Sequence, residues 1–248
     1  MLRIILSGCL GKMGKVITNI VDNRKDCEIV CGIDINEGEA PYPVFSDISK
    51  VDIKADCVID FSHPSALSGV LEFAKQNKIA AVIATTGLSA EQIEEIKAAA
   101  EIIPVFFSFN MSLGVNLLLE LAKKAATVLE GFDIEIIEKH HNQKIDAPSG
   151  TAVMLAEGIN EVKNNSMIYE YDRHSKRQKR TDNEIGIHAV RGGTIVGEHD
   201  VLFCGRDEII TLSHSARSKE IFAVGAVNAA LFVADKPHGL YNMGDIVK

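Results

Sequence analysis

Residues 3–14 read RIILSGCLGKMG, an apolar run that ends at a glycine and leads into a segment with helical spacing. A short apolar run bounded by a turn residue is typical of a buried strand. Apolar residues then recur at helical intervals from Gly11 to Asp22, which predicts a helix. A strand, a glycine turn and a helix in this order favour a Rossmann-like, doubly wound α/β fold.

The same alternation continues to about residue 107. We expect further strands at 27–33, 55–61, 79–84 and 102–107, and helices at 64–77 and 89–100. Residues 89–92 (SAEQ) have the pattern of a capping box, which marks the start of the second of these helices. Strands that alternate regularly with helices predict a parallel sheet with its ligand crevice at the carboxyl ends of the strands.

The pattern changes after Met111. Here we expect a long helix at 113–129, a strand at 132–140, a helix at 149–160, a polar irregular segment at 161–183, and strands at 185–190, 194–196, 199–203 and 208–213. Strands that follow each other without helices indicate a second, α+β domain with a mixed or antiparallel sheet. We therefore expect a first domain of residues 1–111 with 219–248, which include a last helix at 221–234, and a second domain of residues 112–218.

The composition is that of an ordinary globular protein, with 248 residues, 46% hydrophobic and 24% charged, and a net charge of -8. The absence of a long basic block argues against a nucleic acid partner. We expect no signal peptide, and no apolar run approaches the roughly 20 residues of a membrane span. The five cysteines lack the spacing of a zinc site, and Cys27, Cys31 and Cys57 lie within apolar runs, as expected of reduced core residues. These features predict a cytoplasmic protein with no membrane partner.

Gly8, Gly11 and Gly14 follow the first strand and open the first helix. Glycines at this place allow a tight turn and a close approach of the backbone to a pyrophosphate at the helix N-terminus. Their spacing, G-x-x-G-x-x-G, departs from the usual G-x-G-x-x-G, so a plain strand-to-helix turn is the alternative. Asp34 lies 20 positions after Gly14, at the end of the second strand, where an acid would bind the hydroxyls of the adenine ribose. The combination predicts a dinucleotide site.

The residues around Asp34 favour NADH over NADPH as the cofactor. The aspartate would repel a 2′-phosphate and Ile35 supplies no guanidinium, although Lys12 remains available to a phosphate. Two further strand ends, Ala84–Gly87 and Ser108–Met111, should line the same crevice and hold the nicotinamide and its ribose. Ordinary turn chemistry is the alternative for each of them.

Residues 138–152 read EKHHNQKIDAPSGTA and combine several groups suited to proton transfer and anion binding. An imidazole can move a proton near neutral pH, and Lys144 adds a positive charge. His140 and His141 end a strand, so their side chains should point in opposite directions. The Pro-Ser-Gly-Thr turn can open a helix, whose first backbone N–H groups attract anions. Asp146 is expected to be a cap or a partner of Lys144. The segment predicts a small anionic substrate that is protonated during the reaction.

At this point the chain closely resembles the 4-hydroxy-tetrahydrodipicolinate reductase (dihydrodipicolinate reductase) family of diaminopimelate and lysine biosynthesis, over nearly its whole length. The resemblance is carried by the 138–152 segment, the glycine loop and the stretches DFSHP (60–64), ATTG (84–87), NMS (110–112), RGG (191–193), GEH (197–199) and GLYNM (239–243). Three positions depart from the family pattern: Ala84 where Gly is common, Met111 where Phe is common, and Ile35 where many members carry Arg. These departures bear on the choice of cofactor.

The resemblance implies an NAD(P)H-dependent oxidoreductase that reduces 4-hydroxy-tetrahydrodipicolinate to tetrahydrodipicolinate with loss of water. Loss of water leaves a conjugated imine, the nicotinamide adds hydride, and the resulting enamine-like centre is protonated. The resemblance further implies a homotetramer assembled through the sheet of the second domain.

The family pattern also assigns roles to single residues. His140 would be the proton donor and acceptor and Lys144 a second proton donor, while His141, Gly150 and Thr151 would bind the substrate carboxylates. The cofactor-binding residues implied by the resemblance are Gly8, Cys9, Leu10, Gly11, Lys12, Met13, Asp34, Ala84, Thr85, Thr86, Ser108, Phe109, Asn110 and Met111.

Two other functions remain open from the residues alone. Another two-domain NAD(P)-dependent amino-acid dehydrogenase would share the first domain but would not need the His-His-x-x-Lys and Ser-Gly-Thr set. A non-catalytic NADH-sensing module would need neither proton donor. No metal site is expected, because the remaining histidines are scattered and form no helical ligand pair.

Overall fold

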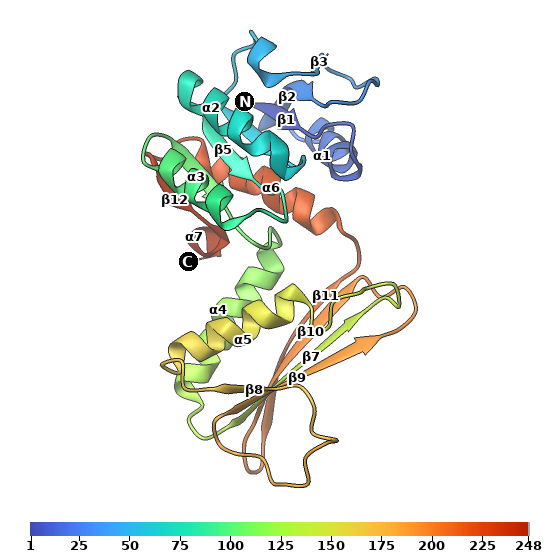
Figure 1. Cartoon of the computed structure of the whole chain (residues 1–248), viewed down its shortest axis with the longest axis vertical. Coiled ribbons are helices and arrows are strands. Elements are labelled where there is room, and N and C mark those ends of the chain that lie inside the picture. Colours follow the sequence, from blue (N-terminus) through green and yellow to red (C-terminus); the bar gives the residue numbers. More distant parts are fainter. Residues whose placement is uncertain (248) are drawn as a thin grey trace. The chain divides into compact units, whose positions relative to one another are not determined.

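The polypeptide builds most of one structural unit, crosses into a second, and then returns to the first. The first unit consists of Met1–Leu113 and Glu220–Ile246, and the second of Gly114–Lys219. The computed structural model describes residues 1–247 (Figure 1).

A seven-stranded sheet forms the centre of the first unit. Its strands, in spatial order, are β12 (Gly239–Tyr241), β6 (Pro104–Phe107), β5 (Ala80–Ile83), β4 (Cys57–Asp60), β1 (Leu2–Ser7), β2 (Cys27–Ile33) and β3 (Val44–Phe45). Every neighbouring pair is parallel. All residues of β4 and β5 are buried, as expected of strands that are covered on both faces.

Helices cover both faces of this sheet. On one face, α1 (Lys12–Asp22) and α6 (Glu220–Val233) enclose a core that includes Ile4, Leu6 and Val82. On the other, α2 (Leu67–Asn77) and α3 (Ala90–Ala100) enclose a core that includes Ile5, Val58 and Ile83. The side chains alternate between the two cores along β1, as the two-residue period of a strand requires. The predicted doubly wound, Rossmann-like sheet is confirmed.

The second unit is a five-stranded mixed sheet with two helices on one face. Its strands, in spatial order, are β11 (Ile209–Ala216), β10 (Gly197–Cys204), β7 (Asp133–His140), β9 (Glu184–Arg191) and β8 (Ile168–Glu170). The pairs β10–β7 and β10–β11 are antiparallel, whereas β7–β9 and β8–β9 are parallel. The predicted α+β domain with a mixed sheet is confirmed.

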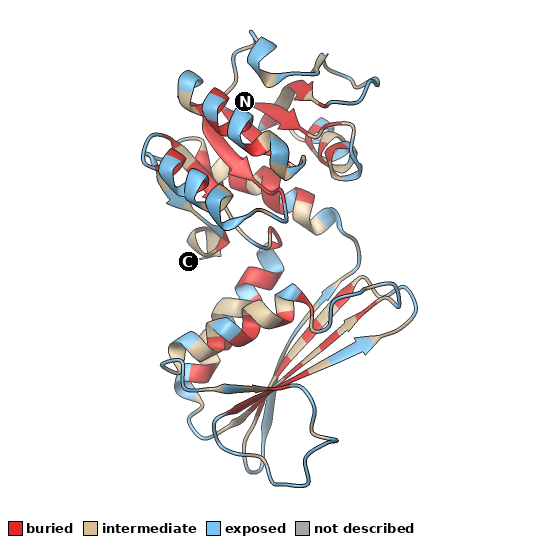
Figure 2. Cartoon of the chain, viewed as in Figure 1, coloured by how far each residue is buried: buried red, intermediate tan, exposed pale blue. Residues whose placement is uncertain are grey.

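Burial alternates strictly along β7 and β10, so one face of this sheet packs and the other does not (Figure 2). The packed face contacts α4 (Leu113–Val128) and α5 (Gly150–Val162) through Leu118, Ala122, Leu155 and Ala156. The alternation also puts Glu138 and His140 on the packed face, because they share the register of the core residues Ile134 and Ile136.

Several short elements differ from the expectations. Residues 161–183, expected to be irregular, contain β8. Residues 194–196, expected to be a strand, are not one: Thr194 belongs to a turn with Gly193, whose φ is +50°, and residues 195–196 are irregular. The helix expected at 64–77 begins as a 3₁₀ turn at Pro64–Ala66. The strands β3 and β12, the helix α7 (Met243–Val247) and the 3₁₀ turn Ile48–Lys50 were not expected.

The predicted capping box at the start of α3 is confirmed. Ser89 accepts a hydrogen bond from the backbone N–H of Gln92, and the Gln92 side chain accepts one from the N–H of Ser89. The predicted burial of Cys27, Cys31 and Cys57 is confirmed as well, and all five cysteines are free. Within residues 1–247, the helices are too short or too polar to span a membrane.

Candidate active site

The glycine loop connects β1 to α1 with little room for side chains. Gly8 has a φ of +78°, and a Cβ added there would lie 2.6 Å from the carbonyl oxygen of Phe61. A Cβ at Gly14 would lie 2.3 Å from the carbonyl oxygen of Gly8. Gly11 is the N-cap of α1 and no side chain caps that helix, so its first N–H groups are open to an anion. Lys12 and Met13, which are also expected to bind the cofactor, are the first two residues of α1.

Asp34 follows β2 and is tied to this loop. Its Oδ2 accepts a hydrogen bond from the backbone N–H of Leu10 at 3.0 Å, and its Oδ1 accepts one from the N–H of Asn36 at 3.0 Å. A carboxylate has about four acceptor positions, so capacity remains for a ribose hydroxyl. Burial, and secondarily the charge of Asp34, raise the pKa of the Cys9 thiol to about 11, which keeps Cys9 protonated. Ile35 is 89% exposed beside the carboxylate.

The two other strand ends lie after β5 and β6. Ala84 and Thr85 are buried and Thr86 is exposed. After β6, the Ser108 hydroxyl donates to the carbonyl of Asn110 at 3.1 Å. Phe109 is 80% exposed and makes an edge-to-face contact with Phe107, whereas Met111 is buried in the core beneath α6. Because all these strands are parallel, the residues expected to hold a cofactor meet at the carboxyl edge of one sheet.

Asp60 joins these strand ends and was not assigned a role from the sequence. It is fully buried at the end of β4. Its Oδ2 accepts from the Thr85 hydroxyl at 2.6 Å, and its Oδ1 accepts from the Ser62 hydroxyl at 2.5 Å. The sequence signal for Asp60 is an aspartate at the end of an otherwise apolar strand. A buried carboxylate needs hydrogen-bond partners, so such an aspartate is expected to bind polar side chains of the neighbouring strand ends.

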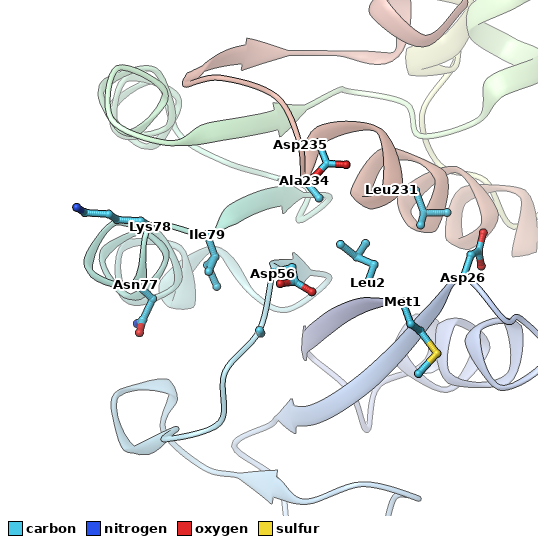
Figure 3. Close-up of a pocket in the computed structure, with 11 residues that line it drawn as sticks. Met1, Leu2, Asp26, Asp56, Asn77, Lys78, Ile79, Leu231, Ala234 and Asp235 are labelled. Atoms are coloured by element: carbon cyan, nitrogen blue, oxygen red, sulfur yellow. The ribbon is translucent and has the colours of Figure 1, made fainter.

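A cavity of about 650 Å³ lies in the first unit, but at the opposite edge of the sheet (Figure 3). Its lining includes Leu2 of β1, Asp56 just before β4 and Ile79 just before β5, all at the amino ends of their strands. Asp56 accepts a hydrogen bond from the backbone N–H of Arg3 at 2.7 Å, and Asp26, also in the lining, pairs with Arg24. None of the residues expected to be functional lines this cavity.

A second group of polar residues surrounds the end of β7 in the second unit. The carboxylate of Glu138 is fully buried. Its Oε2 lies 2.6 Å from Nδ1 of His140, and its two oxygens accept hydrogen bonds from both terminal nitrogens of Arg191, each at 2.7 Å. Oε1 also accepts from the backbone N–H of Ser149 at 3.0 Å. Burial raises the pKa of Glu138, but the hydrogen bonds from Arg191, His140 and Ser149 outweigh it, so the pKa is lowered and the group is ionised.

Lys144 lies in the loop that follows β7. Its Nζ is 2.9 Å from Oδ1 of Asp146, so the predicted pairing of Lys144 with Asp146 is observed. The hydrogen bond from Lys144 lowers the pKa of Asp146. Arg191 donates to the backbone carbonyl of Asp146 at 2.6 Å, which anchors this loop to β9. His141 is half-buried, and its carbonyl accepts from the N–H of Lys144 at 3.1 Å.

Ser149 caps α5, of which Gly150 and Thr151 are the first two residues. The Ser149 hydroxyl oxygen accepts from the N–H of Ala152 at 3.2 Å and lies 3.0 Å from Nε2 of His199. Burial, and then the neighbouring His140, lower the pKa of His199 to about 4, so its imidazole is neutral. A hydrogen bond therefore joins the Ser149 hydroxyl to the neutral ring of His199 at Nε2.

The structure thus gathers the expected residues into two groups, one in each unit. Besides Asp60 in the first unit, sequence reasoning did not assign Glu138, Arg191 and His199 in the second. Glu138 has a signal in the sequence, because it lies two residues before His140 on one strand and so shares its face. Arg191 and His199 are brought to the site by the pairing of β9 and β10 with β7. Within residues 1–247, no cluster of three or more His, Cys, Asp or Glu side chains has the arrangement of a metal site.

Comparisons with known proteins match the whole length of the chain. The family model described as dihydrodipicolinate reductase, N-terminus, matches residues 2–111, and the model described as dihydrodipicolinate reductase, C-terminus, matches residues 114–247. The 4-hydroxy-tetrahydrodipicolinate reductase of Caldanaerobacter subterraneus subsp. tengcongensis is 53% identical over 248 residues, which cover 100% of this chain and 99% of that protein. The enzyme of the same name from Clostridium novyi is 49% identical over 250 residues, with 100% and 99% covered.

Among solved structures, the dipicolinate-bound dihydrodipicolinate reductase from Paenisporosarcina sp. TG-14 matches with a TM-score of 0.85 and 29% identity. The match covers 99% of both chains.

Proposed function

This chain belongs to the dihydrodipicolinate reductase family, and on that premise we propose how its residues divide the work of the reaction. The protein is an NAD(P)H-dependent oxidoreductase that reduces 4-hydroxy-tetrahydrodipicolinate in diaminopimelate and lysine biosynthesis. Family models that cover both halves of the chain leave the amino-acid dehydrogenase and the NADH sensor without support.

The first domain, residues 1–111 with 219–248, binds the dinucleotide. The residues present fit such a group, because Gly8 and Gly14 keep the β1–α1 loop free of side chains and the first turn of α1 lacks a side-chain cap. Asp34 binds the ribose hydroxyls, and Ile35 adds no positive charge for a 2′-phosphate, so NADH is the preferred cofactor. The strand ends Ala84–Thr86 and Ser108–Met111 hold the nicotinamide half. When bound, the reduced nicotinamide supplies the hydride.

The second domain, residues 112–218, binds the dicarboxylate substrate. The amides of Gly150 and Thr151 at the start of α5 and the side chain of His141 receive the carboxylates, because helix N-termini attract anions. The solved relative that carries dipicolinate, a planar dicarboxylate, supports a substrate of this class.

His140 and Lys144 supply protons to the reduced ring. Glu138 accepts the hydrogen at Nδ1 of His140, so Nε2 of that imidazole is the atom that transfers the proton. Lys144 offsets negative charge on the substrate and donates the second proton once it leaves Asp146. The bonds that join His140 to the start of α5 through Glu138 are the observation that carries this assignment, since they link a proton donor to an anion site.

Four copies of the chain assemble through the sheet of the second domain. Both helices of this unit pack on the same face of the sheet, so its other face is free to pair with another copy. The protein acts in the cytoplasm, in keeping with its five free cysteines.

A coupled assay tests the proposed reaction. Dihydrodipicolinate synthase generates the unstable substrate from pyruvate and aspartate semialdehyde, and the oxidation of NADH and of NADPH is followed separately. Oxidation that depends on the synthase, and is faster with NADH, is the expected result. Absence of oxidation with either cofactor, in a protein that binds NADH, would overturn the proposal.

A further inference from the structure

Glu138 has no contact with solvent and yet is charged. Its carboxylate receives four hydrogen bonds, from Nδ1 of His140, from two nitrogens of Arg191 and from the backbone N–H of Ser149. A buried charge is tolerated only when it is paired and its acceptor positions are filled. Every partner of this carboxylate therefore has a defined place, and displacing one of them leaves a buried charge underbonded.

The first consequence concerns the tautomer of His140. An ionised carboxylate only accepts hydrogen bonds, so the 2.6 Å contact requires the hydrogen of the imidazole to be on Nδ1. The other groups packed near this ring are Arg191 on β9, the neutral imidazole of His199 on β10 at 5.3 Å between ring centroids, and the backbone of Gly197. None of these groups accepts a hydrogen bond from Nδ1 in place of Glu138. Nε2 is thus the atom that exchanges a proton with the substrate, and it carries no hydrogen while the ring is neutral.

The second consequence concerns the loop that contains Lys144. Arg191 uses one terminal nitrogen twice, for Oε1 of Glu138 and for the backbone carbonyl of Asp146. The Glu138 carboxylate also holds the N–H of Ser149, the cap of α5. One buried ion pair therefore connects the ring of His140, the loop between β7 and α5, and the first turn of α5.

We propose that Glu138 and Arg191 are positioning residues that set the tautomer of His140 and hold the two proton donors in register with the start of α5. This inference rests on the proposed function, in which His140 and Lys144 donate protons and the start of α5 binds the substrate. Neither residue touches the substrate; both act through His140 and through the loop.

The substitution Glu138→Gln tests this role, because a glutamine has nearly the same shape but only one acceptor oxygen. Its NH2 group would meet either Nδ1 of His140 or the nitrogens of Arg191, which are donors. The kcat of the full-length enzyme is expected to fall roughly 100-fold or more, as when an imidazole loses the carboxylate that sets its tautomer. The Kd for NADH, which binds in the first domain, should stay within about twofold because no cofactor contact changes.

The matched control is Glu161→Gln. Glu161 lies near the end of α5 and pairs with Lys123 of α4 at 3.0 Å, away from His140 and from the face of the sheet through which copies are proposed to assemble. Its kcat should equal that of the wild-type protein. An equal loss of kcat in both variants would mean that any ion pair of this unit has the same effect, and would overturn the proposal.

Histidine-selective ¹⁵N labelling reads the tautomer directly and does not depend on turnover. The unchanged protein should show hydrogen on Nδ1 of His140, and Glu138→Gln should shift the population toward Nε2. An unchanged tautomer, or an unchanged kcat, would overturn the role of Glu138.

If Glu138→Gln does not fold, Glu138→Asp replaces it as the test. Its shorter carboxylate should lower kcat and leave the Kd for NADH unaltered, and a normal kcat would reject the proposal. If the wild-type protein shows no synthase-dependent oxidation of either cofactor, the proposed reaction itself is rejected. This outcome is distinct from a failure of the role of Glu138.

Discussion

The backbone nitrogen of Leu10 lies 3.0 Å from Oδ2 of Asp34, so the acid expected to bind the ribose also holds the glycine loop in place. The loop and the carboxylate come from the ends of β1 and β2, which are neighbours in the sheet. We therefore expect a change at Asp34 to affect both the proposed contact with the ribose and the position of the glycine loop.

Replacing Asp34 by Asn should weaken NADH binding by roughly 10- to 100-fold, because a charged acceptor for a ribose hydroxyl is lost. Binding of NADPH should suffer less, since the negative charge that repels a 2′-phosphate is removed. Titration of both cofactors by nicotinamide fluorescence measures the two Kd values. Glu37→Gln, a change at an exposed acid three residues on, is the control and should leave both unaltered. An unchanged ratio in Asp34→Asn would remove Asp34 from the cofactor site.

The variant His140→Ala should lose roughly 10²- to 10⁴-fold in kcat, the usual contribution of a general acid. Its Kd for NADH should stay close to that of the unchanged protein, because His140 belongs to the second unit. Steady-state rates in the coupled assay and a separate NADH titration give the two numbers. His174→Ala, which removes an exposed histidine of the second unit, is the control and should keep its kcat. Normal turnover by His140→Ala would refute its role.

Lys144→Met should lower kcat and raise the KM for the dicarboxylate, because both a proton donor and a positive charge are lost. The control variant is Asp146→Asn, which breaks the same 2.9 Å contact but keeps the lysine. It separates the effect of losing the amine from the effect of losing the ion pair. Asp146→Asn should stay within a few-fold of normal kcat, since the pair is partly exposed and exposed pairs contribute little. Equal losses in the two variants would show that the pair, and not the amine, matters.

Gly14→Ala should destabilise the first unit, because the new Cβ would lie 2.3 Å and 2.5 Å from the carbonyl oxygens of Gly8 and Cys9. Backbone atoms cannot yield as a flexible side chain does, and overpacking of this kind costs about 1–3 kcal/mol or more. Thermal unfolding of the cofactor-free protein measures it. In Gly11→Ala the nearest atom would be 3.2 Å away, so the loss should be clearly smaller. Equal Tm values for both variants would contradict the packing argument.

Stability should decrease as the pH falls from about 6.5 to about 4 because of His199. Its pKa is lowered from 6.5 to about 4 by burial, so over this interval the unfolded chain takes up a proton that the folded protein does not. The contribution of His199 to the free energy of unfolding is fully present above about pH 6.5. Tm values at pH 7 and pH 5 should therefore differ less in His199→Gln than in the unchanged protein. His174→Gln, at an exposed position, is the control and should leave the difference in Tm between pH 7 and pH 5 unchanged. The same unchanged difference in His199→Gln would contradict the role of His199.

The long elements could be predicted because their periodicity is local. The apolar runs at 27–33 and 57–60 and the helical spacing of 12–22 are properties of adjacent residues, and the regular alternation of such segments predicts a parallel sheet. Short strands were missed for the opposite reason. Gly239–Tyr241 is a strand only because β6 lies beside it, and Ile168–Glu170 only because it pairs with β9.

The candidate site divides in the same way. His140, Lys144 and the start of α5 are consecutive in the sequence, so their grouping could be predicted. Arg191 is more than fifty positions from Glu138, and its bidentate contact depends on the parallel register of β7 and β9, which no local pattern encodes. The same holds for His199, which lies opposite Glu138 in the register of β10 against β7 and is hydrogen-bonded to Ser149, the cap of α5.

The return of the chain to its first unit has a consequence for synthesis. Helix α6 fills one face of the seven-stranded sheet with Ala226, Val227 and Ala230, but it starts 113 positions after β6 ends at Phe107. At the roughly 5–20 residues per second of translation, the strands emerge from the ribosome about 6 to 23 seconds before the helix that covers them. During that interval the second unit, which is continuous in sequence, is synthesised. The first unit is therefore the last to be completed in the nascent chain, and the apolar sheet residues that α6 covers, such as Val82, lack this helix until then.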